Sequence, residues 1–475
     1  MNHSFFRRGP VAVASLSCLL AVAVAAPEAG AGGMNLHTRG VRPSARGGAF
    51  VGGADDLGAL WFNPAGLVHT VGPHRNFLFD VAYVNQAVDY KRVDSSGDPE
   101  EQVSNEAPGL PVPSIGYGQS LNSRTVIAFG MYAPYAGLGK FKDDGPQRYS
   151  TVDLSESLIV VFTAGVAFKL SKNIRVGATV ENMVSNLVSK VVMSGCPRNV
   201  FCFPEDPQWD AMVKATQLDL LSPSVSLGAQ FDLGKLVTFG ASARGPFWID
   251  GRGKVEARLP TSPQYDGAHV EGDRGDLSFV IPPVLRAGLE FHPGRWRFEA
   301  AVDAELWSMH KEIRIEPKDV RIENLGGIGT YELGPVVIPR HFKNSYAGSI
   351  GVETQPLAAV PLRLLGGYTY ETAAAPDEYL SVLTVDGNKQ VFAGGVGFKF
   401  GTWTIDAMGT FATMDQRTVK SGPVDENGVA APGVGMVPQL NPVRTEEDPR
   451  DVARVNFGSY NSSWFAAGVG VTKSF

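Results

Sequence analysis

Residues 285–306 read LRAGLEFHPGRWRFEAAVDAEL and contain two alternating segments separated by a short turn, His292-Pro293-Gly294-Arg295. Apolar residues alternate with charged or small residues over 285–291 and again over 296–306. Successive side chains of a β-strand point to opposite faces, so each segment predicts a strand with one apolar face and one charged face. Six charged side chains on two adjacent strands suit a polar lumen, and the apolar face then suits lipid.

The same alternation recurs along the chain in segments of about ten residues, which is typical of transmembrane β-barrels. An even strand number places both termini on one side, with short turns at one end and long loops at the other. The pattern predicts fourteen strands, over residues 76–90, 110–118, 125–135, 157–170, 174–192, 216–231, 236–244, 281–291, 296–307, 345–354, 361–371, 388–400, 402–411 and 462–475. The predicted outer loops are 91–109, 136–156, 193–215, 245–280, 308–344, 372–387 and 412–461.

The composition excludes several other classes of protein. After residue 31 no apolar run reaches the length of about 18 residues that a membrane-spanning helix requires. The net charge of −6 and the absence of a long basic run argue against a nucleic-acid partner. We therefore expect an all-β fold, an antiparallel transmembrane barrel in the outer membrane of a bacterium.

The start of the chain has the features of a secretory signal. Arg7 and Arg8 precede a small-apolar run over 11–26, and Ala29-Gly30-Ala31 forms a cleavage site. We expect residues 1–31 to be removed. Export places Cys196 and Cys202 in an oxidising compartment, where they can form a disulfide that staples a loop. Two unpaired thiols in a flexible loop are the alternative.

Residues 32–75 do not alternate but are rich in small residues and glycine, and they include Asn63-Pro64-Ala65-Gly66. A barrel of fourteen strands leaves a lumen, which such a compact segment can fill as a hatch. Asn-Pro is also typical of an ordinary turn. The barrel itself is expected over 76–475, ending in an alternating strand whose aromatic Phe475 is typical of the signal that barrel-assembly machinery reads.

The glycine-rich start, the Arg42 and Arg46 ahead of residues 47–50, and the Asn63-Pro64-Ala65-Gly66-Leu67 stretch resemble the hatch of the FadL/TodX family of outer-membrane transporters. The likeness extends over the mature chain to its terminal Phe. It implies passive uptake of long-chain fatty acids or other hydrophobic molecules by loop capture, lumen binding, hatch rearrangement and exit through the barrel wall. No cofactor is implied. We expect a monomer surrounded by outer-membrane lipid and lipopolysaccharide.

Particular residues are candidates for each step. The apolar side chains in the 193–215 loop suit a ligand-capture surface, with simple loop packing as the alternative. Gly130 suits a bend at a wall opening, or relief of crowding against the hatch. Four arginines suit a ligand carboxylate, or salt bridges across the lumen. The capture candidates are Phe201, Phe203, Trp209, Met212 and Val213, and the arginines are Arg175, Arg244, Arg286 and Arg297.

Two other classes of function remain open. A general porin or a structural surface barrel would also carry charged residues in its lumen. An outer-membrane hydrolase is less favoured, because the sequence contains no G-x-S-x-G or H-E-x-x-H motif and no zinc-type cysteine pair.

Overall fold

The computed structural model describes residues 39–69, 75–94, 96–198, 200–203, 205–357, 359–423, 425, 430–444 and 453–475 of the chain. The predicted signal segment, 1–31, and its cleavage site lie outside the described residues, as do the first residues of the predicted hatch.

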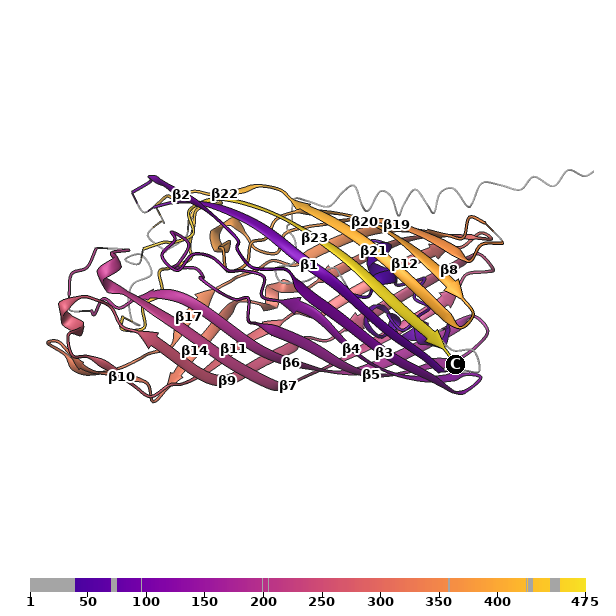
Figure 1. Cartoon of the computed structure of the whole chain (residues 1–475), viewed down its shortest axis with the longest axis horizontal. Coiled ribbons are helices and arrows are strands. Elements are labelled where there is room, and N and C mark those ends of the chain that lie inside the picture. Colours follow the sequence, from indigo (N-terminus) through magenta and orange to yellow (C-terminus); the bar gives the residue numbers. More distant parts are fainter. Residues whose placement is uncertain are drawn as a thin grey trace, which may run out of the picture.

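The wall is a closed antiparallel barrel of fourteen strands, which confirms the predicted fold (Figure 1). The first wall strand pairs with the last from Asn76 opposite Ser474 to Arg92 opposite Gly458, and this pairing closes the ring. The backbone N–H of Phe475 donates to the carbonyl of Arg75 at 2.9 Å. The wall strands are β1 (Arg75–Val93), β3 (Leu110–Asn122), β4 (Thr125–Ala136), β5 (Leu158–Lys169), β6 (Ile174–Ser194), β7 (Asp210–Asp232), β8 (Val237–Arg244), β12 (Val284–Phe291), β13 (Trp296–Glu305), β18 (Ser345–Thr354), β19 (Leu362–Glu371), β20 (Lys389–Phe400), β21 (Trp403–Met414) and β23 (Gly458–Ser474).

The alternation places apolar side chains outside and charged side chains inside. In β12, Leu285 is 47% exposed whereas its neighbour Arg286 is 4% exposed. Arg286 lies opposite Asp303 of β13, and Glu290 lies opposite Glu299. The outward face therefore suits lipid, and the inward face carries the charged groups of the lumen.

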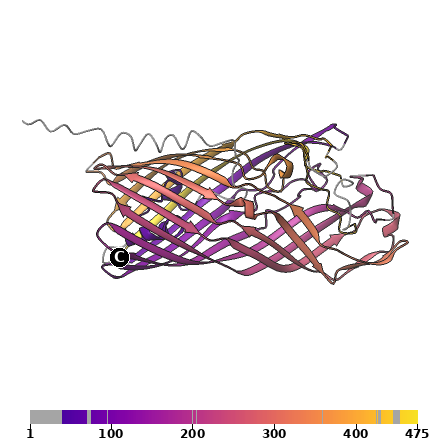
Figure 2. The ribbon, with the colours of Figure 1, turned by 180° about the vertical axis from the view of Figure 1, so that it is seen from behind.

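The outer end differs from the prediction, because much of the predicted loops 245–280 and 308–344 consists of strands that extend the wall (Figure 2). β8 ends before Gly245-Pro246 and β12 begins after Pro282-Pro283. Proline cannot donate to a sheet, so the strands are interrupted there and resume beyond. The extension runs from β7 through β9 (Phe247–Arg258), β11 (Arg274–Ile281), β14 (Glu312–Lys318) and β17 (Val336–Pro339).

The remaining elements of the outer end are short. They are β2 (Pro99–Ser104), β10 (His269–Glu271), β15 (Arg321–Leu325), β16 (Gly329–Glu332), β22 (Arg417–Val419), η2 (Pro207–Trp209), η3 (Pro263–Tyr265), η4 (Trp307–Met309) and η5 (Asp377–Tyr379). Within the described residues, no helix has the length and apolarity needed to cross a bilayer.

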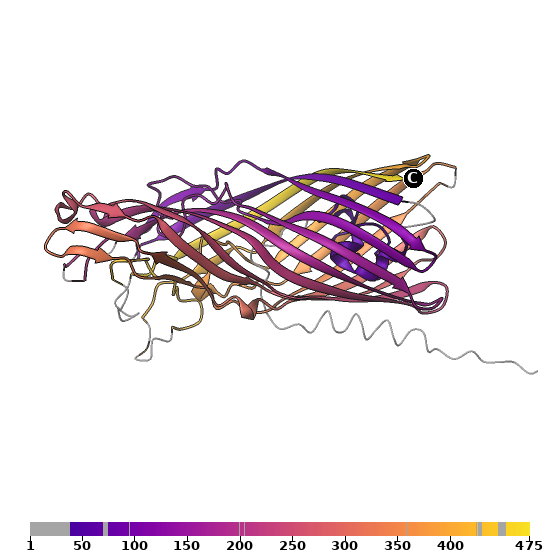
Figure 3. The same cartoon turned by 90° about the horizontal axis from the view of Figure 1, so that it is seen from below.

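The described part of the predicted hatch, 39–69, lies inside the barrel. It contains α2 (Val41–Ala45), α3 (Ala59–Phe62) and η1 (Pro64–His69). Figure 3 shows these indigo elements enclosed by the wall near the end that carries the C-terminus. Nearly all of their side chains are buried. The hatch therefore fills the lumen toward the end that we assign to the periplasm.

A continuous apolar cluster fills the lumen from the hatch outward. It begins with hatch residues such as Leu60 and Phe62 and reaches Ile315 and Val336 in the outer extension. Leu440, from the long segment before β23, joins the same cluster from above. We call this cluster the apolar column. Its other wall residues include Val161, Met183, Val213, Phe247, Ile249, Val255, Leu277, Phe279 and Ile281.

Candidate functional site

Glycines on the inner face of the wall make room for the hatch, some for its backbone and others for its side chains. A Cβ added to Gly240 would lie 2.3 Å from the carbonyl oxygen of Val51, and one added to Gly351 would lie 2.8 Å from the carbonyl oxygen of Arg46. These separations are too short for real side chains, so the hatch fits against the wall only because glycine has no Cβ. We call this set the glycine girdle: Gly116, Gly130, Gly165, Gly177, Gly228, Gly240, Gly288, Gly351, Gly367 and Gly395.

The predicted hatch motif begins at Asn63, between α3 and η1, and continues into η1. Asn63 is buried, and its Nδ2 donates to the carbonyl oxygens of Val51 at 3.0 Å and of Ala229 in β7 at 3.1 Å. Its Oδ1 accepts from the N–H of Ala65 at 3.2 Å. A Cβ on Gly228 would meet Pro64 at 2.8 Å. Asn63 therefore makes a local turn and at the same time ties the hatch to the wall.

Buried ion pairs hold one side of the hatch to the wall. Nη2 of Arg46 donates to Glu290 at 3.1 Å and to Glu299 at 3.0 Å. Glu299 also accepts from the backbone N–H groups of Val51, Gly52 and Gly53 at 2.6, 2.7 and 3.1 Å. Charge-assisted hydrogen bonds to a carboxylate are the stronger kind. This contact fixes the 46–53 segment to β12 and β13.

A second arginine extends this attachment to β18. Arg42 binds both carboxylate oxygens of Glu353 at 2.9–3.1 Å and also pairs with Asp55 and Asp56 of the hatch. Burial raises the pKa of Asp55, but Arg297 and Arg42 outweigh burial and hold that pKa well below its ordinary range. Burial raises the pKa of Asp56. The pairs of Arg42, Arg46 and Arg297 with these carboxylates form what we call the hatch anchor.

The opposite side of the hatch meets the wall through apolar side chains. A Cβ on Gly130 of β4 would lie 2.8 Å from Cδ1 of Leu60, and one on Gly116 of β3 would lie 3.1 Å from Cβ of Leu57. On this side Tyr132 Oη donates a hydrogen bond to the carbonyl of Leu57, at 3.2 Å. The hatch therefore rests on β3–β5 mainly through leucine side chains.

Gly130 itself lies in regular pairing, opposite Gly116 on one side and Thr163 on the other. The register of β4 with β5 is interrupted between Tyr132 and Tyr135, a few residues farther along the strand. The geometry at Gly130 matches relief of crowding against the hatch. Its role at a wall opening stays a prediction.

A closed barrel with an internal hatch and a lumen that is apolar above it matches a known group of proteins. Residues 22–434 match the model of a family described as outer membrane protein transport protein (OMPP1/FadL/TodX). The chain belongs to this family. It is an outer-membrane transport protein, and the family and its solved relatives are transporters and channels rather than enzymes.

Solved structures share this fold at low sequence identity. A FadL homologue from Pseudomonas aeruginosa aligns with a TM-score of 0.71 and 14% identity, covering 94% of this chain and 99% of that protein. The toluene transporter TbuX of Ralstonia pickettii aligns at 0.61 and 14%, covering 92% and 98%. The toluene transporter TodX of P. putida aligns at 0.61 and 15%, with the same coverage. No curated protein sequence matches this chain.

The four candidate lumen arginines of this FadL/TodX-family chain fall into two groups. Arg175 binds both carboxylate oxygens of Asp232, at 2.7 and 2.5 Å, and Gln230 at 3.1 Å. Arg297 belongs to the hatch anchor, with bonds to Asp55 at 2.6 Å and to Glu290 at 2.9 and 3.0 Å. Both side chains have acceptors within the protein.

Arg244 and Arg286 are less fully bonded. Nη2 of Arg244 donates to Tyr135 Oη at 3.0 Å, and Nη1 of Arg286 donates to the carbonyl of Trp61 at 3.4 Å. Nε of Arg286 lies 3.7 Å from Asp303 Oδ2. These two arginines approach each other at Trp61 of the hatch.

The candidate capture residues are divided between three places. Phe201 and Phe203 are 83% and 70% exposed, and their ring centroids lie 5.3 Å apart. Trp209 is buried beneath the loops, with its ring centroid 6.4 Å from that of Tyr265. Met212 packs beside a small cluster around Tyr149 and Val437, and Val213 belongs to the apolar column. Only the two phenylalanines have the exposure that first contact with a ligand requires.

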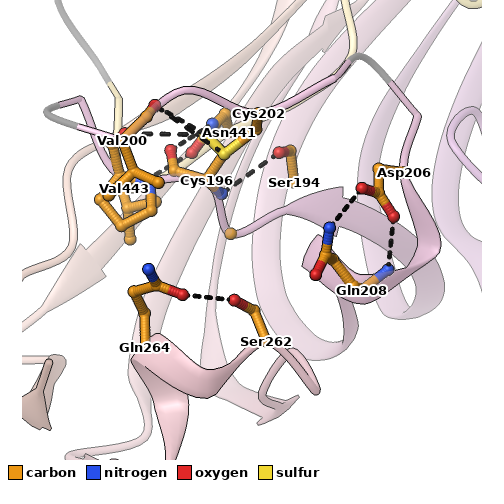
Figure 4. Close-up of a disulfide and its surroundings, with 12 residues drawn as sticks. Ser194, Cys196, Val200, Cys202, Asp206, Gln208, Ser262, Gln264, Asn441 and Val443 are labelled. Carbon is orange, nitrogen blue, oxygen red and sulfur yellow. Dashed lines mark hydrogen bonds between the residues drawn. A yellow bond between two sulfur atoms is a disulfide. The ribbon is translucent and has the colours of Figure 1, made fainter.

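A disulfide joins Cys196 to Cys202 at the base of these phenylalanines (Figure 4). The carbonyl of Cys196 accepts from Nδ2 of Asn441 at 3.0 Å, and the N–H of Ser194 donates to the carbonyl of Leu440 at 2.7 Å. The disulfide loop is therefore connected to the segment that covers the apolar column from above.

In the described residues, no cluster of His, Cys, Asp or Glu could hold a metal ion.

The glycine girdle was not recognised from the sequence, although a signal for it exists. Several wall strands carry a glycine among bulky or charged inward residues, and Gly177 pairs with Gly228 as Gly240 pairs with Gly288. Glycine weakens a strand, so its repetition on one face indicates that another backbone approaches.

Proposed function

We propose that this protein takes up long-chain fatty acids or other hydrophobic small molecules passively across the outer membrane. The observation that carries the proposal is the apolar column, which runs inside the barrel from the outer loops to the hatch. A pore for hydrophilic solutes would not require an apolar column inside the barrel. Neither a cofactor nor an energy source is required.

The apolar column lowers the main free-energy cost of this transport, which is exposure of the alkyl chain to a polar medium. A chain of about sixteen carbons gains roughly 12 kcal/mol from leaving water, at about 0.8 kcal/mol per methylene. It must nevertheless cross the polar sugars outside the membrane before it reaches lipid. An apolar barrel interior shields the alkyl chain of the ligand while it crosses this polar layer.

Capture would begin at the outer end of the barrel. Phe201 and Phe203 present exposed rings on a loop that the disulfide Cys196–Cys202 constrains. Exposed apolar pairs of this kind are common at ligand-contact surfaces. Val213 lies farther in, on the wall of the apolar column, so a ligand that leaves the rings can continue along β7.

Exit would use the weakly attached side of the hatch. The hatch anchor fixes the hatch to β12, β13 and β18, whereas the contacts with β3–β5 are mainly leucine side chains. Displacing apolar contacts by an apolar ligand costs little, because one buried surface replaces another. The same sector contains the interrupted pairing of β4, and we propose that the ligand leaves sideways there into the membrane. The part of the hatch that stays attached to the wall would then act as the hinge of the gate. It includes Asn63, Pro64, Ala65 and Gly66.

A general porin is the alternative, and the filled lumen disfavours it. The test is uptake of radiolabelled palmitate by cells that lack their own fatty-acid transporter and express this chain, with entry of a hydrophilic β-lactam as the counter-measurement. Palmitate uptake without β-lactam entry is the expected result. Entry of the β-lactam without palmitate uptake would identify a porin and end the proposal.

Removal of residues 32–67 tests the gate itself. We expect a folded barrel with altered palmitate uptake and an increased hydrophilic leak. A folded deletion variant in which both quantities equal those of the full chain would show that the hatch gates nothing. Roles for Phe475 in assembly and for lipopolysaccharide as a neighbour remain predictions.

A further inference from the structure

A crevice opens on the outside of the barrel at the seam where β1 meets β23 and closes the ring. Lys91 of β1 lies opposite Ser459 of β23, and Ser459 lies opposite Thr418 of β22. The other edge of β1 pairs with β2, and Figure 1 shows β2 and β22 at the outer end of the barrel. The crevice has a volume of about 360 Å³. We call it the seam crevice, and its polar lining consists of Lys91, Thr418, Lys420, Ser421 and Ser459.

The polar lining of the seam crevice suits an anion. It combines two ammonium groups, from Lys91 and Lys420, with three hydroxyl groups. Among the residues that the structure describes, no carboxylate lines the crevice and neither lysine forms an ion pair. Asp89, two positions before Lys91 on β1, accepts instead from the hydroxyl of Ser104 at 2.5 Å. Lysine binds phosphate as a point charge, and hydroxyl groups can donate further hydrogen bonds to its oxygens.

The strand register shows that the seam crevice faces away from the lumen. Tyr83 of β1 and Phe465 of β23 are both 46% exposed, and their ring centroids lie 6.2 Å apart. Side chains two positions apart on a strand share a face, so Lys91 lies on the same outward face as Tyr83, and Ser459 on the same face as Phe465. The crevice therefore opens toward the surroundings of the barrel.

Its height along the strand places the seam crevice above the lipid tails. Exposed aromatic rings such as those of Tyr83 and Phe465 form the girdle at the edge of the apolar band of a barrel. Lys91 follows Tyr83 by eight positions (91 − 83) on the same strand. At about 3.3 Å per residue and a strand tilt of about 40°, it lies roughly 20 Å beyond the girdle along the barrel axis. That height corresponds to the sugar layer that covers the outer leaflet.

We propose that the seam crevice binds a phosphate group on the core sugars of lipopolysaccharide, with Lys91 and Lys420 as the cations. Its volume lies within the range of sites for small molecules, so there is room for the phosphate and the sugar that carries it. The proposal concerns the outside of the barrel and does not depend on which molecule the lumen transports.

A glycolipid bound there would also stabilise the outer end of the barrel. The backbone N–H of Lys420 donates to the carbonyl of Gly433 at 2.9 Å, and the N–H of Gly435 donates to the carbonyl of Lys420 at 3.1 Å. Residues 433–435 lead directly into the segment that covers the apolar column. The bound phosphate would therefore connect the two strands that close the barrel with the start of that segment.

The test compares two preparations of lipopolysaccharide that differ only in whether the core sugars carry phosphate. Each is titrated onto the purified full chain in detergent, with EDTA present to remove bridging divalent cations. Two exposed ion pairs predict that the phosphorylated form binds about fivefold more tightly. The double variant Lys91→Gln and Lys420→Gln should bind both preparations with equal affinity.

A matched double variant separates the seam crevice from the general charge of the outer end. Lys254 and Lys318 also lie outside on the outer extension, but they pair with Asp273 at 2.5 Å and with Glu316 at 2.9 Å. Lys254→Gln with Lys318→Gln should therefore keep the fivefold preference. Folding of each variant is checked by the heat-dependent shift of the barrel on a denaturing gel.

Inorganic phosphate, titrated as a competitor in the same assay, distinguishes a free anion from a glycolipid. It should displace the phosphorylated lipopolysaccharide only at concentrations far above that of the glycolipid. Displacement at equal concentration would show that the crevice recognises the free ion and would overturn the proposal.

Three other results would also contradict the proposal. They are equal binding of both preparations by the wild-type chain, a preference that survives in the Lys91 and Lys420 double variant, and an equal loss of preference in the two double variants. None of these results bears on the uptake function, because palmitate uptake is measured separately.

Discussion

Gly240 of β8 and Gly288 of β12 face each other across two neighbouring wall strands, and both lie against the hatch backbone at Val51 and Gly52. A Cβ on Gly240 would overlap the carbonyl of Val51. Overpacking of this kind costs about 1–3 kcal/mol. Gly240→Ala should therefore shift the hatch toward a displaced position by about tenfold and raise ionic conductance in planar bilayers.

Gly409→Ala is the matched control, because nothing lies within 4 Å of a Cβ at that position in β21. It should leave the conductance at the wild-type level. Equal conductance in all three proteins would show that the girdle does not position the hatch.

Loss of Arg46 should loosen the hatch without unfolding the barrel. Arg46→Met leaves Glu299 buried without its cation, whereas Glu290 keeps Arg297 as a partner, and breaking a buried pair in this way costs about 3–5 kcal/mol. Hydrogen exchange over residues 46–53 should accelerate, while exchange in β12 and β13 changes little. Lys318→Met, at an exposed ion pair in the outer extension, is the control and should leave hatch exchange unchanged.

The disulfide should stabilise residues 436–444, the segment that covers the apolar column. Cys196 and Cys202 are six positions apart, and closing so short a loop contributes about 2 kcal/mol on the chain-entropy account. Replacing both cysteines by serine should increase hydrogen exchange over 194–202 and, through Asn441, over 436–444. Unchanged exchange over 436–444 would mean that the cover is held independently of the disulfide loop.

His310 should make the outer loops sensitive to acid. Its Nδ1 bonds the carbonyl of Val280 at 2.8 Å, and its ring packs against Trp307 and Phe342. Burial, and then Arg340, lower the pKa of His310 from 6.5 to about 3. A histidine that the fold keeps neutral contributes stability above its unfolded pKa and loses it as the pH falls below that value, by about 1.4 kcal/mol per pH unit.

Protection factors over 307–315, corrected for the intrinsic exchange rate, should therefore fall as the pH drops below 6.5. His310→Gln keeps a donor for Val280 but cannot titrate in this range. Its protection should stay flat with pH. An equal fall in both proteins would assign the acid sensitivity to other groups.

Strand positions could be predicted from the sequence because alternation reports directly which face meets lipid. Leu285 beside Arg286 fixes the orientation of β12 without any knowledge of its neighbours. The outer extension could not be predicted in the same way. β9 has charged residues such as Arg252 and Lys254 on its outward face, above the membrane, where alternation no longer separates lipid from water.

The candidate site was only partly predictable, because partners distant in sequence decide what a side chain does. Arg175 and Arg244 look alike in the sequence, since both are inward residues of wall strands. Within the part of the chain that the structure describes, Arg175 binds the carboxylate of Asp232, whereas Arg244 donates only to the hydroxyl of Tyr135. Trp209 likewise reads as an exposed loop residue until Tyr265 from another loop covers it.

The girdle also limits how such proteins can be recombined. Hatch and wall fit so closely that neither is an interchangeable part: a bulkier hatch grafted into this barrel would collide with Gly367 and Gly240, and this hatch would sit loosely in a barrel whose inner face is deeper. Engineering a transporter for a new cargo should therefore begin in the column above the hatch, where side chains rather than backbones meet.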